Sequence, residues 1–263
     1  MDYLGGLQYL QTDELHGLCH NVKDEQDNIV VMMFTKGHIE EALNCITSYY
    51  NSTGKQNVLV FALDNETKLA MDTNNISCYY HHLFFQDDVI HKDIGTIYFK
   101  KIAFNKLLCI YACLQLQINV LWSDTDIVYF KNPFNRLMEI SKDISIQNNI
   151  KGSTEKKTCS GFMYYRSTNH SLSFLKKCIE FIHVNYERLL TCGGLADQAI
   201  LNKFHDDNIM TILPINEFPC GLVWWDNYNT DNWKQDSYMV HNNWITGVDN
   251  KIKRFKESGL WFL

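Results

Sequence analysis

Three short apolar segments, separated by stretches with helical periodicity, constrain the fold of this chain most strongly. They are Asn28–Phe34, Val58–Leu63 and Asn119–Trp122, and each has the length of a buried β-strand. Helices are predicted between them at His38–Tyr50 and Thr96–Gln117. Short apolar strands that alternate with helices indicate a mostly parallel sheet covered by helices on both faces. A chain of 263 residues is long enough to build one such α/β domain.

The second half of the chain continues this pattern. A strand is predicted at Gly161–Tyr165, followed by helices at Leu172–Val184 and Ala196–Phe204. The first 27 residues are polar, with charges gathered near their end, and are predicted to form an N-terminal arm or a lead-in helix. We therefore expect a single folded domain that spans residues 28–263.

An Asp-Thr-Asp sequence directly follows the third apolar segment. Asp124 and Asp126 stand between that predicted strand and a second apolar run, Ile127–Phe130. A tight turn at this place can direct both carboxylates at one cation, and Mg2+ and Mn2+ prefer oxygen ligands that substrate phosphates complete. Ligands bind beyond the carboxyl ends of parallel strands, where Thr35 and Asp64 are also expected. The pattern predicts a divalent-cation site; the alternative is a pair of carboxylates that cap neighbouring amides.

Four segments in the same order resemble those of a known family, the nucleotide-diphospho-sugar transferase domain grouped as glycosyltransferase family 77. The longest is FKKIAFNKLLCIYACLQLQINVLWSDTDIVYFKNPF, which contains the Asp-Thr-Asp sequence. The others are CSGFMYYRST, ADQAILN and VHNNWITGVDNKIKRFKESGLW. The resemblance covers about residues 28–263 and implies a GT-A fold, Rossmann-like, with one catalytic domain. It implies transfer of a sugar from a nucleoside-diphosphate sugar, with UDP as the expected nucleotide, to a hydroxyl acceptor with retention.

The resemblance also implies a third metal ligand. In GT-A enzymes of this kind a histidine near the C-terminal end joins the two aspartates, and His241 matches that position. A neutral imidazole can complete a shell of carboxylates and phosphates, and Mn2+ accepts it more readily than Mg2+. The expected metal site is therefore Mn2+, or Mg2+, held by Asp124, Asp126 and His241.

Further residues are implied to bind or activate the donor. Lys106 would reach the diphosphate or the sugar, although a solvated helix lysine is the simpler interpretation. Gly247 and Lys251 resemble a phosphate-binding loop, in which glycine permits close backbone approach and lysine neutralises the leaving group. Asp197 and Gln198, at the start of a helix, are the expected catalytic residues that orient or stabilise the anomeric centre. Capping of that helix is the alternative for Asp197.

An aromatic platform is expected near the C-terminal end. Trp225 with Asp226 offers a flat apolar ring and a hydrogen-bonding acid, which suits a sugar, while a core role for the ring is the alternative. Lys253 or Arg254 could replace Lys251 in neutralising phosphate. The full predicted donor-binding set is Thr35, Asp64, Lys106, Ser123, Asp124, Ser160, Gly247, Lys251, Trp225 and Asp226.

Composition narrows the partners and the location. The net charge is -6, and no basic stripe is visible, so nucleic acid is not an expected partner. The longest apolar runs fall far short of the roughly 18 to 20 residues that span a bilayer, and the N-terminal sequence lacks the features of a signal peptide. Nine cysteines without a CxxC pair suggest reduced thiols. These features favour a cytoplasmic location, with the Golgi lumen as the alternative if an anchor has been trimmed away.

Two rival functions fit part of the sequence. A phosphohydrolase of the haloacid dehalogenase type also carries Asp-x-Asp after an apolar strand, and Ser160, Lys176 and Asp206-Asp207 could complete its site. That motif normally follows the first strand, whereas here well over a hundred residues with two predicted strands and two predicted helices precede it. A non-catalytic sugar-binding module would use the Trp-rich C-terminal segment but would leave both motif aspartates without a role. The expected acceptor is a glycan, a glycoprotein or another hydroxyl compound.

Overall fold

The first apolar segment forms an interior strand of a large sheet, and its seven residues are all buried. The computed structural model describes residues 3–85, 96–149, 158–193, 196–227 and 235–263, with the side chains of residues 196, 226 and 227 excepted. The strands in these ranges are β1 (Asn28–Phe34), β2 (Val58–Ala62), β3 (Cys78–Tyr80), β4 (Asn119–Ser123), β5 (Ile127–Tyr129), β6 (Ile144–Asn148), β7 (Thr158–Tyr165), β8 (Met210–Ile212) and β9 (Met239–His241).

Seven of these strands form one sheet in the order β3-β2-β1-β4-β7-β6-β8, and β5 pairs with β9 in a second, small sheet. In the large sheet β3, β2, β1 and β4 run parallel, as do β6 and β8. Strand β7 is antiparallel to both of its neighbours, β4 and β6. The predicted mostly parallel sheet is therefore confirmed, with β7 as the strand that reverses direction.

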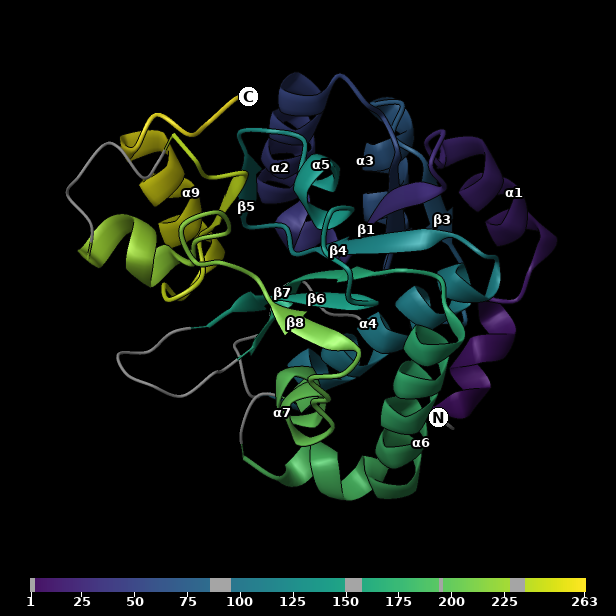
Figure 1. Ribbon diagram of the computed structural model, residues 1–263. Coiled ribbons are helices and arrows are strands. Elements are labelled where there is room, and N and C mark those ends of the chain that lie inside the picture. Colours follow the sequence, from purple (N-terminus) through teal and green to yellow (C-terminus); the bar gives the residue numbers. More distant parts are fainter. Residues whose placement is uncertain (1–2, 86–95, 150–157, 194–195, 228–234) are drawn as a thin grey trace.

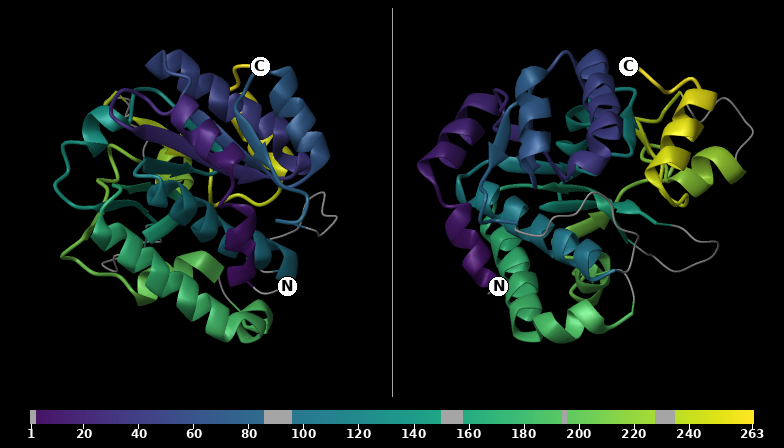
Figure 2. Two further views of the ribbon diagram at one scale, coloured as in Figure 1. Left: turned by 90° about the vertical axis from the view of Figure 1, so that its right-hand side faces the viewer. Right: turned by 180° about the vertical axis from the view of Figure 1, so that it is seen from behind.

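Helices cover both faces of the large sheet, as predicted (Figure 1). In Figure 1, α2 and α3 lie above the sheet and α4, α6 and α7 below it, and the views in Figure 2 show the same layers. The helices are α1 (Asp13–Val22), α2 (Ile39–Thr53), α3 (Asn65–Thr73), α4 (Ile97–Gln115), α5 (Phe134–Leu137), α6 (Asn169–Thr191), α7 (Ala196–Lys203) and α9 (Val248–Glu257), with 3-10 turns η1 (Leu4–Tyr9) and η2 (Lys36–His38) and the π-helical turn η3 (Leu222–Asn227).

Alternation along β1 divides the core into two layers. Val31 packs into the cluster with helices α4 and α6, whereas its neighbours Val30 and Met32 pack into the cluster with α2 and α3. This is the period of two that a strand buried on both faces requires. A third, smaller cluster joins the small sheet to η3 and α9 through Val240 and Phe255.

The N-terminal residues predicted as an arm or a lead-in helix are part of the packed structure where it is described. Helix α1 begins after Thr12, whose hydroxyl accepts a hydrogen bond from the Leu15 amide at 3.1 Å. Leu15 and Cys19 are fully buried in the same cluster as α4. This segment therefore contributes to the core of the domain.

Several boundaries differ from the predicted ones for local reasons. Helix α6 is longer than the predicted Leu172–Val184, because the Thr168 hydroxyl caps its first turn and its last carbonyls accept hydrogen bonds from Lys100. Strands β3, β6, β8 and β9 were not predicted, and they have only three to five residues each. So short a strand carries little periodicity of its own.

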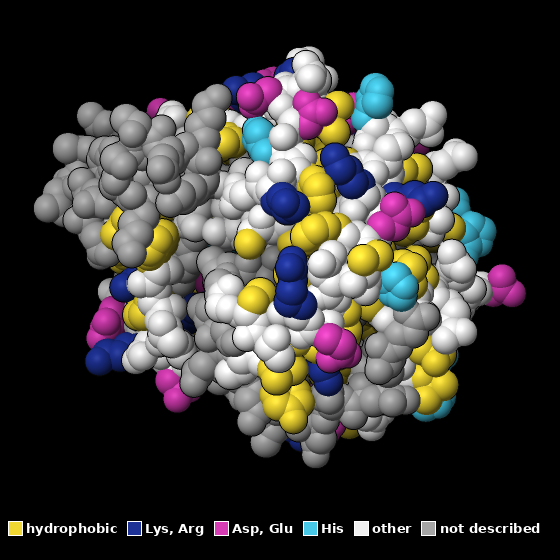
Figure 3. Space-filling view, turned by 90° about the horizontal axis from the view of Figure 1, so that it is seen from below, with side chains coloured by type: hydrophobic (Ala, Val, Ile, Leu, Met, Phe, Trp, Pro, Cys, Tyr) yellow, Lys and Arg dark blue, Asp and Glu magenta, His cyan; other side chains and the backbone are white. Residues whose placement is uncertain are grey.

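Charges are interspersed on the face that is seen from below in Figure 1. Figure 3 shows dark-blue Lys and Arg side chains on this face scattered among acidic and hydrophobic ones. Within the described ranges, no helix combines the length and the apolar composition that crossing a bilayer would need.

Candidate active site

The Asp-Thr-Asp sequence links β4 to β5, where the chain leaves the large sheet for the small one. The Asp124 amide donates to the Gly161 carbonyl at 2.8 Å, and the Asp126 carbonyl accepts from the Asn242 amide at 2.7 Å. One bond ties the turn to β7 and the other ties it to the segment after β9. The two carboxylates therefore project from a turn that is held on both sides.

His241 reaches the same place through the pairing of the small sheet. It is the last residue of β9 and stands opposite Ile127 in the antiparallel register. Its Nε2 lies 3.1 Å from Asp126 Oδ1. Ligand atoms of Asp124, Asp126 and His241 all lie within 4.8 Å of one another. The structure thus brings the three predicted metal ligands together.

Gly161 on β7 leaves the room that a cation at this place would need. A Cβ added to Gly161 would lie 2.2 Å from His241 Cε1 and 2.8 Å from Asp124 Oδ2. Any larger residue would therefore fill the space between two of the three ligands. Two carboxylates and one imidazole form a donor set that suits Mn2+ and is acceptable to Mg2+. The residues present fit a divalent cation on both grounds.

Opposite charges hold Asp126 in its ionised form. Burial by itself raises the pKa of the Asp126 carboxyl, but Lys251 at 2.8 Å and His241 outweigh burial and hold that pKa well below its usual range. Burial also lowers the pKa of His241, yet the adjacent Asp126 charge raises it above the usual histidine value. Asp126 is therefore available as an anionic ligand, for which a cation and the imidazole proton compete.

Lys106 links the metal-ligand cluster to α7. Its Nζ lies 3.4 Å from Asp124 Oδ1 and 3.0 Å from Asp197 Oδ2, the latter as an ion pair outside hydrogen-bond angles. The same Nζ donates to the Ser160 carbonyl at 2.9 Å and lies over the Trp122 ring. Burial lowers the pKa of Lys106, but the two carboxylates raise it above its usual value. A permanent positive charge therefore stands between Asp124 and the predicted catalytic Asp197.

The predicted nucleotide-contacting residues lie at the ends of β1 and β2. Thr35 is buried directly after β1. Asp64 accepts hydrogen bonds from the amides of Lys36 and Thr67, both at 2.7 Å. Its carboxylate therefore caps α3 and ties it to the loop after β1. A contact of either residue with a nucleotide stays a prediction.

The other predicted donor contacts occupy more varied positions. The Ser123 side chain is fully buried and donates to the Asp124 carbonyl at 3.1 Å. Ser160 is buried on β7 and uses its carbonyl for Lys106. Gly247 precedes α9 with a φ of 89°, a backbone conformation that favours glycine. Gln198 lies in the first turn of α7 and is partly exposed. Their roles toward a donor stay predictions.

Trp225 lies in η3 and packs against α9. Its Nε1 donates to Ser258 Oγ at 2.8 Å, its ring contacts Phe255, and the Arg254 guanidinium lies over it at 5.0 Å. These contacts occupy Trp225 in the small core of the C-terminal segment. The Asp226 side chain lies outside the described residues.

Sequence reasoning missed three residues of the site. Gly161 lies within the segment CSGFMYYRST, whose resemblance to the family is the signal that could have found it. Glu41 is fully buried in the first turn of α2, where its Oε2 accepts from Thr125 Oγ1 at 2.8 Å. Gln147 lies at the end of β6, and its Oε1 is 2.7 Å from His241 Nδ1. No sequence signal pointed to Gln147, because β6 itself was not predicted.

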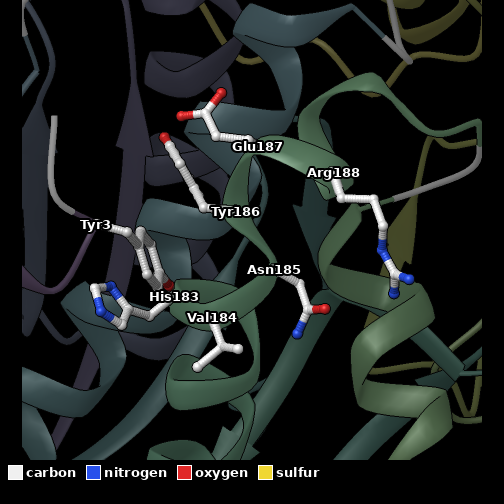
Figure 4. Close-up of a pocket in the computed structure, with 7 residues that line it drawn as sticks. All are labelled: Tyr3, His183, Val184, Asn185, Tyr186, Glu187 and Arg188. Carbon is white, nitrogen blue, oxygen red and sulfur yellow. The ribbon is translucent and has the colours of Figure 1, made fainter.

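A cavity of about 500 Å3 lies elsewhere, beside the C-terminal half of α6. Figure 4 shows its lining, which is Tyr3 together with His183, Val184, Asn185, Tyr186, Glu187 and Arg188. None of the predicted site residues lines it. We therefore place the chemistry at the convergent cluster and not at this hollow.

Two of the residues that the phosphohydrolase alternative needs, Lys176 and Asp206, are engaged elsewhere. Lys176 on α6 is 64% exposed in its side chain and pairs with Glu180. Asp206 accepts hydrogen bonds from the backbone and side chain of Asn208 in a local turn. Neither contact is with the Asp-Thr-Asp sequence.

Solved structures show which class of protein this fold defines. Mouse xyloside xylosyltransferase 1 superposes with a TM-score of 0.53 at 13% identity, covering 84% of this chain and 99% of that protein. The galactosyltransferase LgtC superposes with a TM-score of 0.53 at 11% identity, covering 90% of this chain and 96% of that protein. At such identities the likeness concerns the fold, which is the GT-A fold of glycosyltransferases.

The chain belongs to the nucleotide-diphospho-sugar transferase family, whose model matches residues 53–255. In Arabidopsis thaliana, UDP-D-xylose:L-fucose alpha-1,3-D-xylosyltransferase 1 is 31% identical over 113 residues. The xylosyltransferase MGP4 from the same plant is 31% identical over 111 residues. Each alignment covers 40% of this chain and only 30% of the relative's length. Membership of the family favours the transferase interpretation over the phosphohydrolase alternative.

Proposed function

We propose that this protein transfers a sugar from a UDP-sugar to a hydroxyl of a glycan or another acceptor, with a divalent cation bound by Asp124, Asp126 and His241. One observation carries the metal dependence: three suitable ligands from two distant parts of the chain, Asp124 and Asp126 in one and His241 in the other, converge around the space that Gly161 leaves. Mn2+ is the proposed ion because the donor set includes an imidazole.

UDP-xylose is the first donor to test. The Arabidopsis relatives are named as enzymes that use UDP-D-xylose, and one of the similar folds is a xyloside xylosyltransferase. Family membership supports a nucleotide sugar in general, while the xylose and the uracil are part of this proposal. Thr35 and Asp64, at the ends of adjacent parallel strands, are the proposed contacts to the nucleoside.

The reaction breaks the bond between the anomeric carbon and the diphosphate oxygen, and the electron pair stays on the diphosphate. A new bond forms between the anomeric carbon and the acceptor oxygen, whose proton leaves. In the proposed retaining course, a diphosphate oxygen on the same face takes that proton. A bound divalent cation would stabilise the negative charge that grows on the leaving group.

The residues of the chain divide the remaining tasks. Lys251, 2.8 Å from Asp126, places a positive charge beside the metal ligands and can turn to a phosphate oxygen. Lys106 holds Asp197 beside Asp124, so that Asp197 and Gln198 can orient the anomeric centre. Gly247 permits close backbone approach at the start of α9. The cytoplasmic location stays a prediction from the sequence.

The test is donor hydrolysis with a panel of nucleotide sugars, with Mn2+ or EDTA. The proposal expects UDP release from one UDP-sugar, with loss of release in EDTA and in Asp126→Ala. Asp72→Asn is the matched control, because it alters a half-exposed carboxylate of α3 that pairs only with Lys68 in the described structure. Release that is equally fast in EDTA would refute the metal dependence. Binding of glycans without turnover of any donor would revive the binding-module interpretation.

A further inference from the structure

Gln147 contacts the Nδ1 edge of the His241 ring, whereas the Nε2 edge is turned toward Asp126. Its Oε1 lies 2.7 Å from His241 Nδ1, while the other ring nitrogen, Nε2, lies 3.1 Å from Asp126 Oδ1. Gln147 is fully buried and His241 is 3% exposed. Water therefore does not compete for this contact, and the side chains themselves decide which ring nitrogen carries a proton.

The hydrogen bonds of the Gln147 amide fix its orientation. Its Nε2 donates to the Phe218 carbonyl at 3.2 Å and to the Pro219 carbonyl at 3.0 Å. Carbonyl oxygens only accept, so the amide NH2 must face them and the amide oxygen must face His241. An oxygen acceptor at 2.7 Å requires a proton on Nδ1. Asp126 Oδ1 is also an acceptor, at Nε2, so the metal-free ring favours a proton on each nitrogen; when a cation takes the place of the Nε2 proton, the remaining proton stays on Nδ1 and the lone pair belongs to Nε2.

The backbone around Gln147 is irregular, and this irregularity helps to point the Gln147 side chain at His241. The pairing of β6 with β7 passes from Ile146 opposite Met163 to Gln147 opposite Cys159, so the residues between these pairs on β7 bulge out of register. Bulges commonly re-aim side chains next to active sites. The bulged residues include Gly161, which faces the same imidazole. The same irregularity therefore places Gln147 at His241 Nδ1 and Gly161 beside His241 Cε1.

A competing acceptor is present but is weaker. Cys159 Sγ lies 3.6 Å from His241 Nδ1. A thiol is a poorer acceptor than an amide oxygen, and the contact is longer. Cys159 also accepts from the Asn243 side chain at 3.6 Å. Gln147 is therefore the partner that sets the imidazole orientation.

We propose that Gln147 is a positioning residue for the metal site: it holds the proton of His241 on Nδ1 and so presents Nε2 to the cation. This rests on the proposed function, because it assumes that His241 binds the metal. Hydrogen bonds to the second nitrogen of a metal-binding histidine fix the ring and its tautomer, and their loss typically lowers metal affinity by about 10- to 100-fold.

Two variants isolate the acceptor from the rest of the side chain. Gln147→Met keeps the length of the side chain but removes the oxygen that faces Nδ1. Gln147→Glu also removes the amide NH2, yet it keeps an oxygen at that position. Loss of the bonds to Phe218 and Pro219 affects both variants, so a difference between them reports on the Nδ1 contact.

The first readout is the Mn2+ dissociation constant of the whole chain without donor, measured from free Mn2+ by electron paramagnetic resonance. We expect Gln147→Met to bind about 10- to 100-fold more weakly, and Gln147→Glu to bind within about threefold of the wild type or more tightly. Equal binding by Gln147→Met and the wild type overturns the role of Gln147 and leaves the proposed function intact. A wild-type chain that binds no Mn2+ overturns the proposed metal site and this role together.

The second readout is the position of the His241 proton with Mg2+ bound, since Mg2+ is diamagnetic. Proton–nitrogen correlation spectra of the histidine rings, recorded with saturating Mg2+, distinguish Nδ1–H from Nε2–H. His241→Asn identifies the signal. We expect Nδ1–H for His241 in the wild type and in Gln147→Glu, and a mixture in Gln147→Met. An Nε2–H signal in the wild type would refute the inference, whatever the activity of the enzyme.

Discussion

Replacing Gly161 with alanine tests the geometry of the site with the smallest available change. The φ of Gly161 is not in the left-handed region, so the backbone accepts an L-residue and the effect is steric. The added Cβ would lie 2.2 Å from His241 Cε1, whereas nonbonded carbons are most stable at about 3.5 to 4.0 Å. The imidazole must therefore move by more than about 1 Å.

The expected magnitude follows from this displacement. Misplacement by about 1 Å in a reacting geometry reduces the rate by about 100-fold, and overpacking a buried site costs about 1 to 3 kcal/mol of unfolding free energy. We expect Gly161→Ala to fold, to unfold at a lower temperature, and to lose about 100-fold in Mn2+-dependent release of UDP. The assays are thermal unfolding and donor hydrolysis at saturating Mn2+.

Gly17→Ala is the matched control. Gly17 lies inside α1, and a Cβ there would meet no atom within 4 Å. The same chemical change is expected to stabilise the chain by about 0.5 to 1 kcal/mol, since glycine is unfavourable inside a helix, and to leave the rate unchanged. If Gly161→Ala keeps the wild-type rate and Mn2+ affinity, the space beside Gly161 is not part of the site, and the argument for a cation there fails.

Three further predictions concern charges. Lys106→Met leaves two carboxylates without their buried partner, so it should lower the unfolding free energy by about 3 to 5 kcal/mol in urea titrations, and Lys106→Arg should lower it less. Mn2+ at about 100 times its dissociation constant should raise the unfolding free energy by about 2.7 kcal/mol, and Asp126→Ala should abolish that gain in calorimetry. Burial raises the pKa of Asp24, but Lys55 at 2.7 Å and two backbone amides lower it more, to below its usual value. Its stabilising effect should therefore be complete above about pH 4 and be lost as the pH falls through the folded-state pKa; Asp24→Asn should remove this part of the acid dependence.

The first half of the fold was predictable because its strands are long and apolar. Strand β1 has the predicted bounds, and β2 and β4 differ from theirs by one residue. The strands β6 and β8 were not, since they are short, and β8 pairs with β6, which lies far away in the sequence. Local pattern cannot report a pairing that only the tertiary structure creates.

The candidate site also contains some residues that the sequence predicts and others that only the assembled structure identifies. Asp124 and Asp126 follow a recognisable strand, and His241 was identified from the resemblance, so these residues were found. Gly161 and Gln147 act by leaving space and by orienting a ring, which are properties of the assembled site. Neither carries a charge or a motif that would single it out before the strands are placed.

The small sheet of β5 and β9 also sets the order in which the site can appear during synthesis. His241 is made about 6 to 23 seconds after Asp124 at ordinary rates of translation, and only then can it pair opposite Ile127. A nascent chain on the ribosome can therefore form its central strands while it still lacks one of the three proposed ligands. A chain whose synthesis stops before β9 would fold in part but could not assemble the cluster. Catalytic turnover would therefore indicate that synthesis has continued past His241.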